Sequence, residues 1–201
     1  MISTRPDADP KAGRPRGTST PPWMYLLLLL LFLPAPVGAE SVEQLKVSHQ
    51  GGVYRLSADL LLDAPLAAVR ARLTDYDALT ALSPSIRESR ELPAPPGYQA
   101  RVETQIDACV AMLCRRLHRV EDVREQDDRL IAEIVPGRGN FRAGRTEWLL
   151  TPRGGQVEVR YRAWLEPAFA VPPVLGPALV KQGLEQALRE TLKRLEELAG
   201  G

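Results

Sequence analysis

The sequence predicts one α+β domain in which a curved antiparallel sheet of about six to seven strands wraps around a long C-terminal helix. Several segments between residues 53 and 165 alternate apolar and polar residues, as strands with one buried face do. Two short helical segments follow the first of these strands, and a helical apolar stripe closes the chain. Neighbouring strands that each carry one charged face indicate a sheet with one side in solvent.

The overall composition fits a globular domain and excludes several classes of protein. Of the 201 residues, 44% are hydrophobic and 25% are charged, with a formal net charge of +1. This balance excludes a generic polyanion-binding protein. Two cysteines and two histidines are too few for a disulfide scaffold, a structural zinc site or a His-rich metal centre. We therefore expect no metal, no cofactor and no nucleic-acid partner.

Residues 1–39 are predicted to be a signal peptide. A basic leader precedes an apolar run of 11 residues, Trp23 to Leu33, whereas a bilayer span needs roughly 20. Pro34 breaks the run, and Val37-Gly38-Ala39 has the small residues that signal peptidase reads. Cleavage after Ala39 would leave a single domain, 40–201, in the bacterial periplasm. The alternative is an uncleaved N-terminal anchor in the inner membrane, with the domain facing the periplasm.

The first predicted strand and two short helices lie in residues 53–82. Residues 53–62 place Tyr54, Leu56 and every second residue after them on one face, opposite Arg55 and its alternates. A helix is predicted from Pro65 to about Thr74, because its apolar residues recur at spacings of three and four. A second helical piece covers 76–82.

The remaining strands and the final helix follow in order. Strands are predicted near 86–92, 98–106, 115–123, 130–135, 144–150 and 157–165, separated by Pro-, Gly- and Asp-rich turns. Segment 115–123 has the least regular alternation. The final helix carries an apolar stripe that extends upstream through Leu175 and Leu179 and otherwise consists of Leu184, Leu188, Leu192, Leu195 and Leu198.

The two cysteines give the most specific local pattern. Cys109 and Cys114 would be about 17 Å apart in a straight strand, too far for a disulfide. They can bond only if the four residues between them form a hairpin tip, which the flanking strands require in any case. An oxidising periplasm favours the bond, and two buried thiols are the alternative. The apolar residues Met112 and Leu113 at this tip are predicted to close a cavity mouth or to contact a membrane surface or a partner.

The order of the elements resembles the START-like superfamily, also called SRPBCC, which has the helix-grip fold. Within this superfamily, the sequence looks most like the polyketide cyclase and coenzyme-Q-binding group. The resemblance covers residues 45–199. It is carried by Pro-Leu-Ala-Ala-Val-Arg at 65–70, Leu-Thr-Asp-Tyr-Asp at 73–77, Leu-Ser-Pro-Ser-Ile-Arg-Glu-Ser at 82–89, Gly-Arg-Thr-Glu-Trp at 144–148 and Glu-Pro-Ala-Phe at 166–169.

This resemblance implies a hydrophobic cavity between the sheet and the last helix. Family members bind lipids, quinones, polyketides or other apolar molecules, and many have no catalytic activity. The inward residues of the strands would then line the cavity, and the alternative is that each of them packs the core. These predicted ligand-binding residues are Val102, Thr104, Thr146, Trp148, Leu150, Val159 and Tyr161.

No catalytic residues are predicted. Catalysis needs a nucleophile and a base within reach of each other, and the sequence indicates no such partner and no carboxylate pair for His118. The glycines near 137–144 do not have the spacing of a dinucleotide-binding motif. The resemblance therefore implies non-enzymatic binding that carries or shields a hydrophobic small molecule such as a lipid or quinone. The sequence makes no prediction of oligomeric state.

Two alternative functions remain open. One is a cyclase or dehydratase that uses the same cavity, which an inward His118 or Tyr161 facing an open pocket would favour. The other is a protein-interaction module with a filled core, which a cavity below about 300 Å³ would favour.

Overall fold

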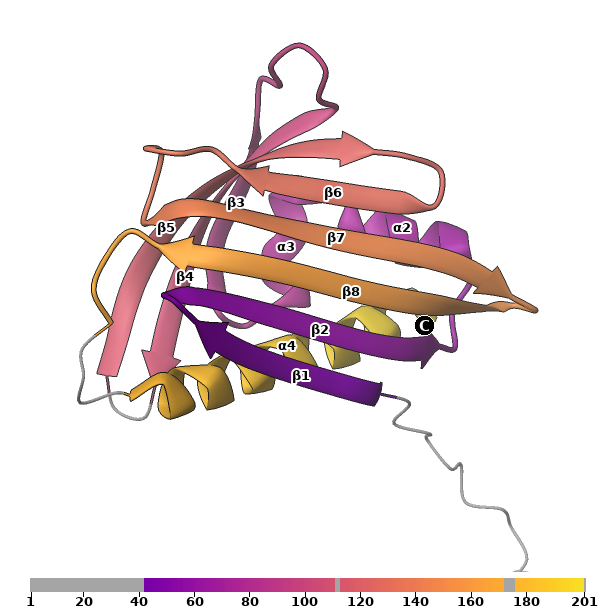
Figure 1. The fold of residues 1–201 in the computed structure, drawn as a ribbon. Helices are drawn as coiled ribbons and strands as arrows, with labels where there is room; N and C mark the ends of the chain where they lie inside the picture. Colours follow the sequence, from indigo (N-terminus) through magenta and orange to yellow (C-terminus); the bar gives the residue numbers. More distant parts are fainter. Residues whose placement is uncertain (1–41, 111–112, 172–175, 201) are drawn as a thin grey trace, which may run out of the picture. The chain divides into compact units, whose positions relative to one another are not determined.

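The computed structural model describes residues 42–110, 113–171 and 176–200, which belong to one compact unit, Glu40–Gly201 (Figure 1). The predicted signal segment, residues 1–39, lies outside the described residues. Within the described part, a curved antiparallel sheet and a C-terminal helix form the helix-grip fold, so the predicted fold class is confirmed.

The described residues form eight strands in a single sheet. They are β1 (Val42–Gln50), β2 (Val53–Leu62), β3 (Ile86–Leu92), β4 (Ala100–Val110), β5 (Leu113–Glu125), β6 (Arg129–Ile134), β7 (Phe141–Arg153) and β8 (Gln156–Pro167). Their order in the sheet is β1-β2-β8-β7-β6-β5-β4-β3, and all neighbours are antiparallel. The sheet has one strand more than the upper estimate, and β1 is the strand that was not predicted.

The helices lie where the sequence places them. After β2 come α2 (Leu66–Leu73) and a 3₁₀ turn (Tyr76–Ala78) that leads into α3 (Leu79–Leu82). The long helix α4 (Gly176–Gly200) closes the chain and contacts β1, β2, β4, α2 and α3. Figure 1 shows α4 lying across one face of the sheet, at the end of the sheet that β1 forms. None of the helices in the described ranges is both long and apolar enough for a bilayer span.

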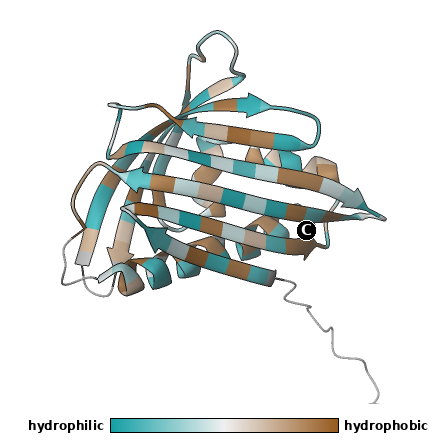
Figure 2. Cartoon of the chain, viewed as in Figure 1, coloured by the Kyte–Doolittle hydropathy of each residue, from teal (hydrophilic) through white to brown (hydrophobic). Residues whose placement is uncertain are grey.

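One hydrophobic core joins the inner face of the sheet to α4. Alternating inner residues of β2, from Tyr54 to Leu62, are buried and pack in one cluster with Leu188, Leu192 and Leu195 of the helix. Figure 2 shows the same alternation of hydrophilic and hydrophobic positions along the strands. Burial of this apolar stripe holds the helix on the sheet.

The upstream end of the predicted helical stripe is not buried. Leu179 is 41% exposed, and Leu175 lies outside the described residues. The first fully buried leucine of α4 is Leu188. The buried residues of α4 therefore begin at Leu188, whereas Val180 and Leu184 pack against the core but are only partly buried.

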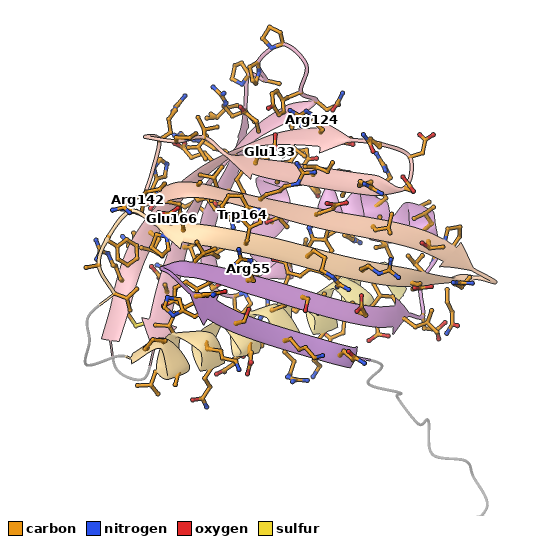
Figure 3. All side chains as sticks on the ribbon, viewed as in Figure 1. Arg55, Arg124, Glu133, Arg142, Trp164 and Glu166 are labelled. Atoms are coloured by element: carbon orange, nitrogen blue, oxygen red, sulfur yellow. A yellow bond between two sulfur atoms is a disulfide. The ribbon has the colours of Figure 1, made fainter. Side chains whose placement is uncertain are left out.

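The outer face of the sheet carries ion pairs between charged residues, as predicted for a solvated face. Arg124 lies 3.1 Å from Glu133, and Arg142 lies 3.2 Å from Glu166. Figure 3 shows these two pairs with Arg55 and Trp164 on the face that α4 leaves uncovered. Exposed pairs of this kind each contribute about 0–1 kcal/mol, so they mainly keep this face solvated.

Candidate functional site

A cavity of about 1000 Å³ lies between the inner face of the sheet and α4, where its lining extends from Val180 to Leu195. Its walls come from β2, the α2–α3 region, strands β3–β8, the segment after β8, and α4. Most of its lining is apolar and includes Leu56, Leu82, Leu117, Phe141 and Leu184. The cavity arises because the sheet curves away from α4 where the helix is not packed into the core.

Four of the seven predicted lining residues face this cavity. They are Val102 of β4, Thr146 and Trp148 of β7, and Tyr161 of β8. Each points inward because residues two apart in a strand share one face of the sheet. The structure thus brings the four together from three strands, but their contact with a ligand stays a prediction.

The other three predicted residues lie inward but outside the cavity wall. Leu150 and Val159 are 0% exposed and pack in the same cluster as Leu192 and Leu195. They belong to the core cluster and do not line the cavity. Thr104 is 1% exposed and lies behind a charged side chain described below.

Trp148 and Tyr161 form the aromatic part of the wall. Their ring centroids are 4.5 Å apart and their planes are inclined at 60°, an edge-to-face pair. Burial raises the pKa of Tyr161 to about 12, even though Arg119 and Thr146 act in the opposite direction. At neutral pH the phenol therefore keeps its proton and can donate a hydrogen bond.

An ion pair from one strand lies in the same wall. Arg119 and Glu121 are two residues apart in β5, and both line the cavity. Arg119 Nε lies 3.0 Å from Glu121 Oε2 and donates to Thr104 Oγ1 at 3.4 Å. The Glu121 residue is only 8% exposed. A charged pair inside an apolar cavity is costly to desolvate, which makes it the strongest chemical feature of the site.

A second tyrosine in the wall, Tyr76, has its hydroxyl already engaged. It donates to Glu125 Oε1 at 2.8 Å, and Arg70 lies 3.3 Å from the other oxygen of that carboxylate. Burial and the neighbouring Glu125 raise the pKa of Tyr76. Through this hydrogen bond, Tyr76 connects the short helices to the end of β5, next to the β5–β6 turn.

The β4–β5 hairpin forms part of the cavity wall. Cys109 and Cys114 face each other across the two strands and form the predicted disulfide, which lines the cavity. Next to it, the Arg115 guanidinium carbon lies 4.0 Å from the ring centroid of Phe169. Met112 and the side chain of Leu113 lie outside the described residues, so their contact with a cavity mouth, membrane or partner stays a prediction.

The candidate histidine lies outside the cavity. His118 is on the outer face of β5, and its Nε2 lies 2.7 Å from Glu103 Oε1. Burial alone would raise the pKa of Glu103, but hydrogen bonds with His118 and Arg90 outweigh it and lower that pKa. Within residues 42–110, 113–171 and 176–200, no cluster of three or more His, Cys, Asp or Glu side chains could hold a metal ion.

The family of the chain follows from its sequence. Residues 55–200 match the profile of the family described as polyketide cyclase / dehydrase and lipid transport. The chain belongs to this family. It is part of the START-like superfamily, as the local segments of the sequence indicated.

Several solved structures share the fold of this family member. The protein TTHA0849 from Thermus thermophilus is 20% identical with a TM-score of 0.60, over 72% of this chain and 96% of its own. A STAR-related lipid transfer protein from Xanthomonas axonopodis is 18% identical with a TM-score of 0.57, over 76% and 97%. The Zhui aromatase/cyclase from Streptomyces sp. R1128 is 14% identical with a TM-score of 0.54, over 73% and 93%. No curated protein matches the sequence.

Sequence reasoning about this family member missed Arg119 and Glu121. Charged residues were expected on the outer face, so these two were not considered as lining residues. The irregular alternation of segment 115–123 was the available signal. The inward residues of this strand are Leu117, Arg119, Glu121 and Val123. The two charged residues interrupt the apolar face, so the alternation of apolar and polar residues is lost.

Proposed function

We propose that this protein binds a hydrophobic small molecule, such as a lipid or a quinone, in the cavity and carries or shields it without changing it. The single observation that carries this proposal is the cavity of about 1000 Å³ with a mainly apolar lining. Such a volume is at the upper end of the range for small-molecule sites, roughly 300–1,000 Å³. It argues against an interaction module with a filled core.

The direct test is to identify what the protein holds. Protein purified from the native periplasm is analysed by native mass spectrometry, and its bound material is extracted with organic solvent. A reproducible apolar species is the expected result. Protein that is consistently empty, and that takes up no apolar probe, contradicts the proposal.

A matched pair of variants links binding to the cavity. Ala187 lies in the cavity wall on α4, whereas Ala71 is exposed on α2 outside the wall. Ala187→Phe fills part of the cavity and should reduce the amount of bound species. Ala71→Phe adds the same side chain elsewhere and should leave that amount unchanged.

Tyr161 and the Arg119–Glu121 pair favour a second candidate, a cyclase or dehydratase. A protonated phenol and a carboxylate facing one cavity are groups that can move protons on a bound substrate. If the protein is a dehydratase or a dehydrating cyclase, Tyr161→Phe should retain a precursor that is one water heavier than the species bound to the wild type, because the lost water comes from that precursor. For a carrier, both proteins should hold the same species.

We also propose that the domain is exported to the bacterial periplasm after removal of residues 1–39. The disulfide supports this location because such bonds persist in oxidising compartments. Cell fractionation and N-terminal sequencing test it. A periplasmic chain that begins at Glu40 is expected. A membrane-bound chain that retains residues 1–39 indicates the anchored alternative.

A further inference from the structure

The charged residues in the cavity wall give it no excess of positive charge. They are Arg115 and Arg119 against Asp107, Glu121 and Glu190. Arg119 and Glu121 contribute one positive and one negative charge, held 3.0 Å apart in the wall. Other lining residues, such as Leu117, Val123 and Thr146, are apolar or uncharged. A ligand that reaches this point meets a pair with no net charge, in surroundings that screen added charge poorly.

The pair still offers hydrogen-bond donors to a ligand. Among the described residues, the only hydrogen bond of the Arg119 guanidinium is from Nε to Thr104. The Arg119 side chain keeps 24% of its surface accessible, compared with 10% for Glu121. Tyr161, in the same wall, is a protonated phenol at neutral pH. The accessible polar groups therefore favour a ligand with acceptor oxygens.

A carboxylate would be a poor ligand at this point. It would bring a second negative charge to a guanidinium that already pairs with Glu121, in a wall that is mainly apolar. Two carboxylates sharing such a site disfavour each other's charged form, and a buried charge without a partner is costly. A ketone, ester or quinone carbonyl accepts the same hydrogen bonds without adding charge.

We propose that the Arg119–Glu121 pair makes the cavity selective for apolar molecules that end in an uncharged carbonyl, and that it rejects the corresponding carboxylates. This inference rests on the proposed binding function and names the class of ligand for the same cavity. Arg119 donates to the carbonyl oxygen, and Glu121 cancels the charge that would otherwise attract fatty acids.

The test compares probes that share one alkyl chain. Methyl palmitate, palmitate and the alkane of the same length compete at neutral pH with a fluorescent apolar dye bound to the full domain. The wild type should bind methyl palmitate at least about tenfold more tightly than palmitate. Equal binding, or tighter binding of palmitate, overturns the inference.

Glu121→Gln gives the sharpest result because it removes the negative charge and keeps the shape. Arg119 is then unpaired, so the preference should invert in favour of palmitate. The control is Glu103→Gln, which makes the same change on the outer face, where Glu103 pairs with Arg90 and His118. It should keep the wild-type preference. An unchanged preference in folded Glu121→Gln overturns the inference.

A double variant covers the case in which Glu121→Gln does not fold. Arg119→Met with Glu121→Met replaces the pair by apolar side chains, a change that buried pairs often tolerate. Its affinity for methyl palmitate should fall about tenfold towards that of the alkane, whose own binding is retained. If the double variant keeps the full affinity for methyl palmitate, the pair does not select the ligand. If the wild type binds none of the three probes, the proposed function itself fails, which is a distinct outcome.

Discussion

The indole of Trp148 and the phenol of Tyr161 lie edge to face across neighbouring strands, with ring centroids 4.5 Å apart, and both rings line the cavity. Trp164 lies on the opposite face of the sheet and is 37% exposed. The domain thus carries one tryptophan inside the site and one outside it.

This arrangement predicts a fluorescence signal for ligand binding. A ligand that enters the cavity displaces water from Trp148, so the tryptophan emission should change on addition of an apolar molecule. Trp148→Phe should lose this change, whereas Trp164→Phe should retain it. A signal that disappears only in Trp164→Phe would place the ligand on the outer face.

Tyr161 predicts a loss of stability at alkaline pH. Its pKa is about 12 in the fold, against 10.0 for an ordinary tyrosine. Because the fold favours the protonated form, this contribution is fully present below pH 10 and is lost as the pH rises towards 12. It amounts to about 3 kcal/mol. Denaturant unfolding of the wild type and Tyr161→Phe should show a stability difference that narrows over this interval. A constant difference contradicts the assignment.

Most of the fold was predictable because strong alternation and a leucine stripe identify its elements. Strand β1 was missed because it has only two inward apolar residues in its described part, Leu45 and Val47, and gains its structure by pairing with β2. The two-residue Gly51-Gly52 turn, with φ of 59° and 82°, was the local signal for that hairpin.

The cavity itself was less predictable than the fold. Leu150 and Val159 have the same inward direction as Thr146 and Tyr161, and all four satisfy the same sequence pattern. Whether an inward strand residue packs in the core or lines the cavity depends on where the sheet curves away from α4. That position is set by packing between distant parts of the chain, which the local pattern does not contain.

The disulfide is predicted to stabilise the fold modestly. It closes a loop of six residues, from Cys109 to Cys114, which is worth about 2 kcal/mol in the chain-entropy model. The Cys109→Ser, Cys114→Ser double variant should lose that much free energy of unfolding and keep its circular dichroism spectrum. Loss of the folded spectrum would show that the bond holds more than the hairpin tip.

Gly139 is predicted to tolerate no side chain. A Cβ at this position would lie 3.0 Å from the carbonyl carbon of His118, with the carbonyl oxygen closer still. The same carbonyl accepts a hydrogen bond from Asn140 N at 2.8 Å, so the backbone there has little freedom to move. Gly139→Ala should cost about 1–3 kcal/mol in thermal or denaturant unfolding. Arg138→Ala, at the exposed neighbouring position, should change stability by at most about 0.5 kcal/mol. If Gly139→Ala and Arg138→Ala lost the same amount of stability, the loop that contains Gly139 would not pack against β5.

Leu192 tests whether α4 is held by its C-terminal half. It is 1% exposed and belongs to the core cluster with Leu62, Leu150 and Val157, but it does not line the cavity. Leu192→Ala should therefore destabilise the domain by about 2–5 kcal/mol, because it leaves a void between the helix and the sheet. Leu179→Ala makes the same truncation at a residue that is 41% exposed, so it should cost less than about 0.5 kcal/mol. Chemical denaturation measures both effects. Similar values for the two variants would mean that the helix is not anchored at its C-terminal half. The cavity would then lack the fixed wall on which ligand binding depends.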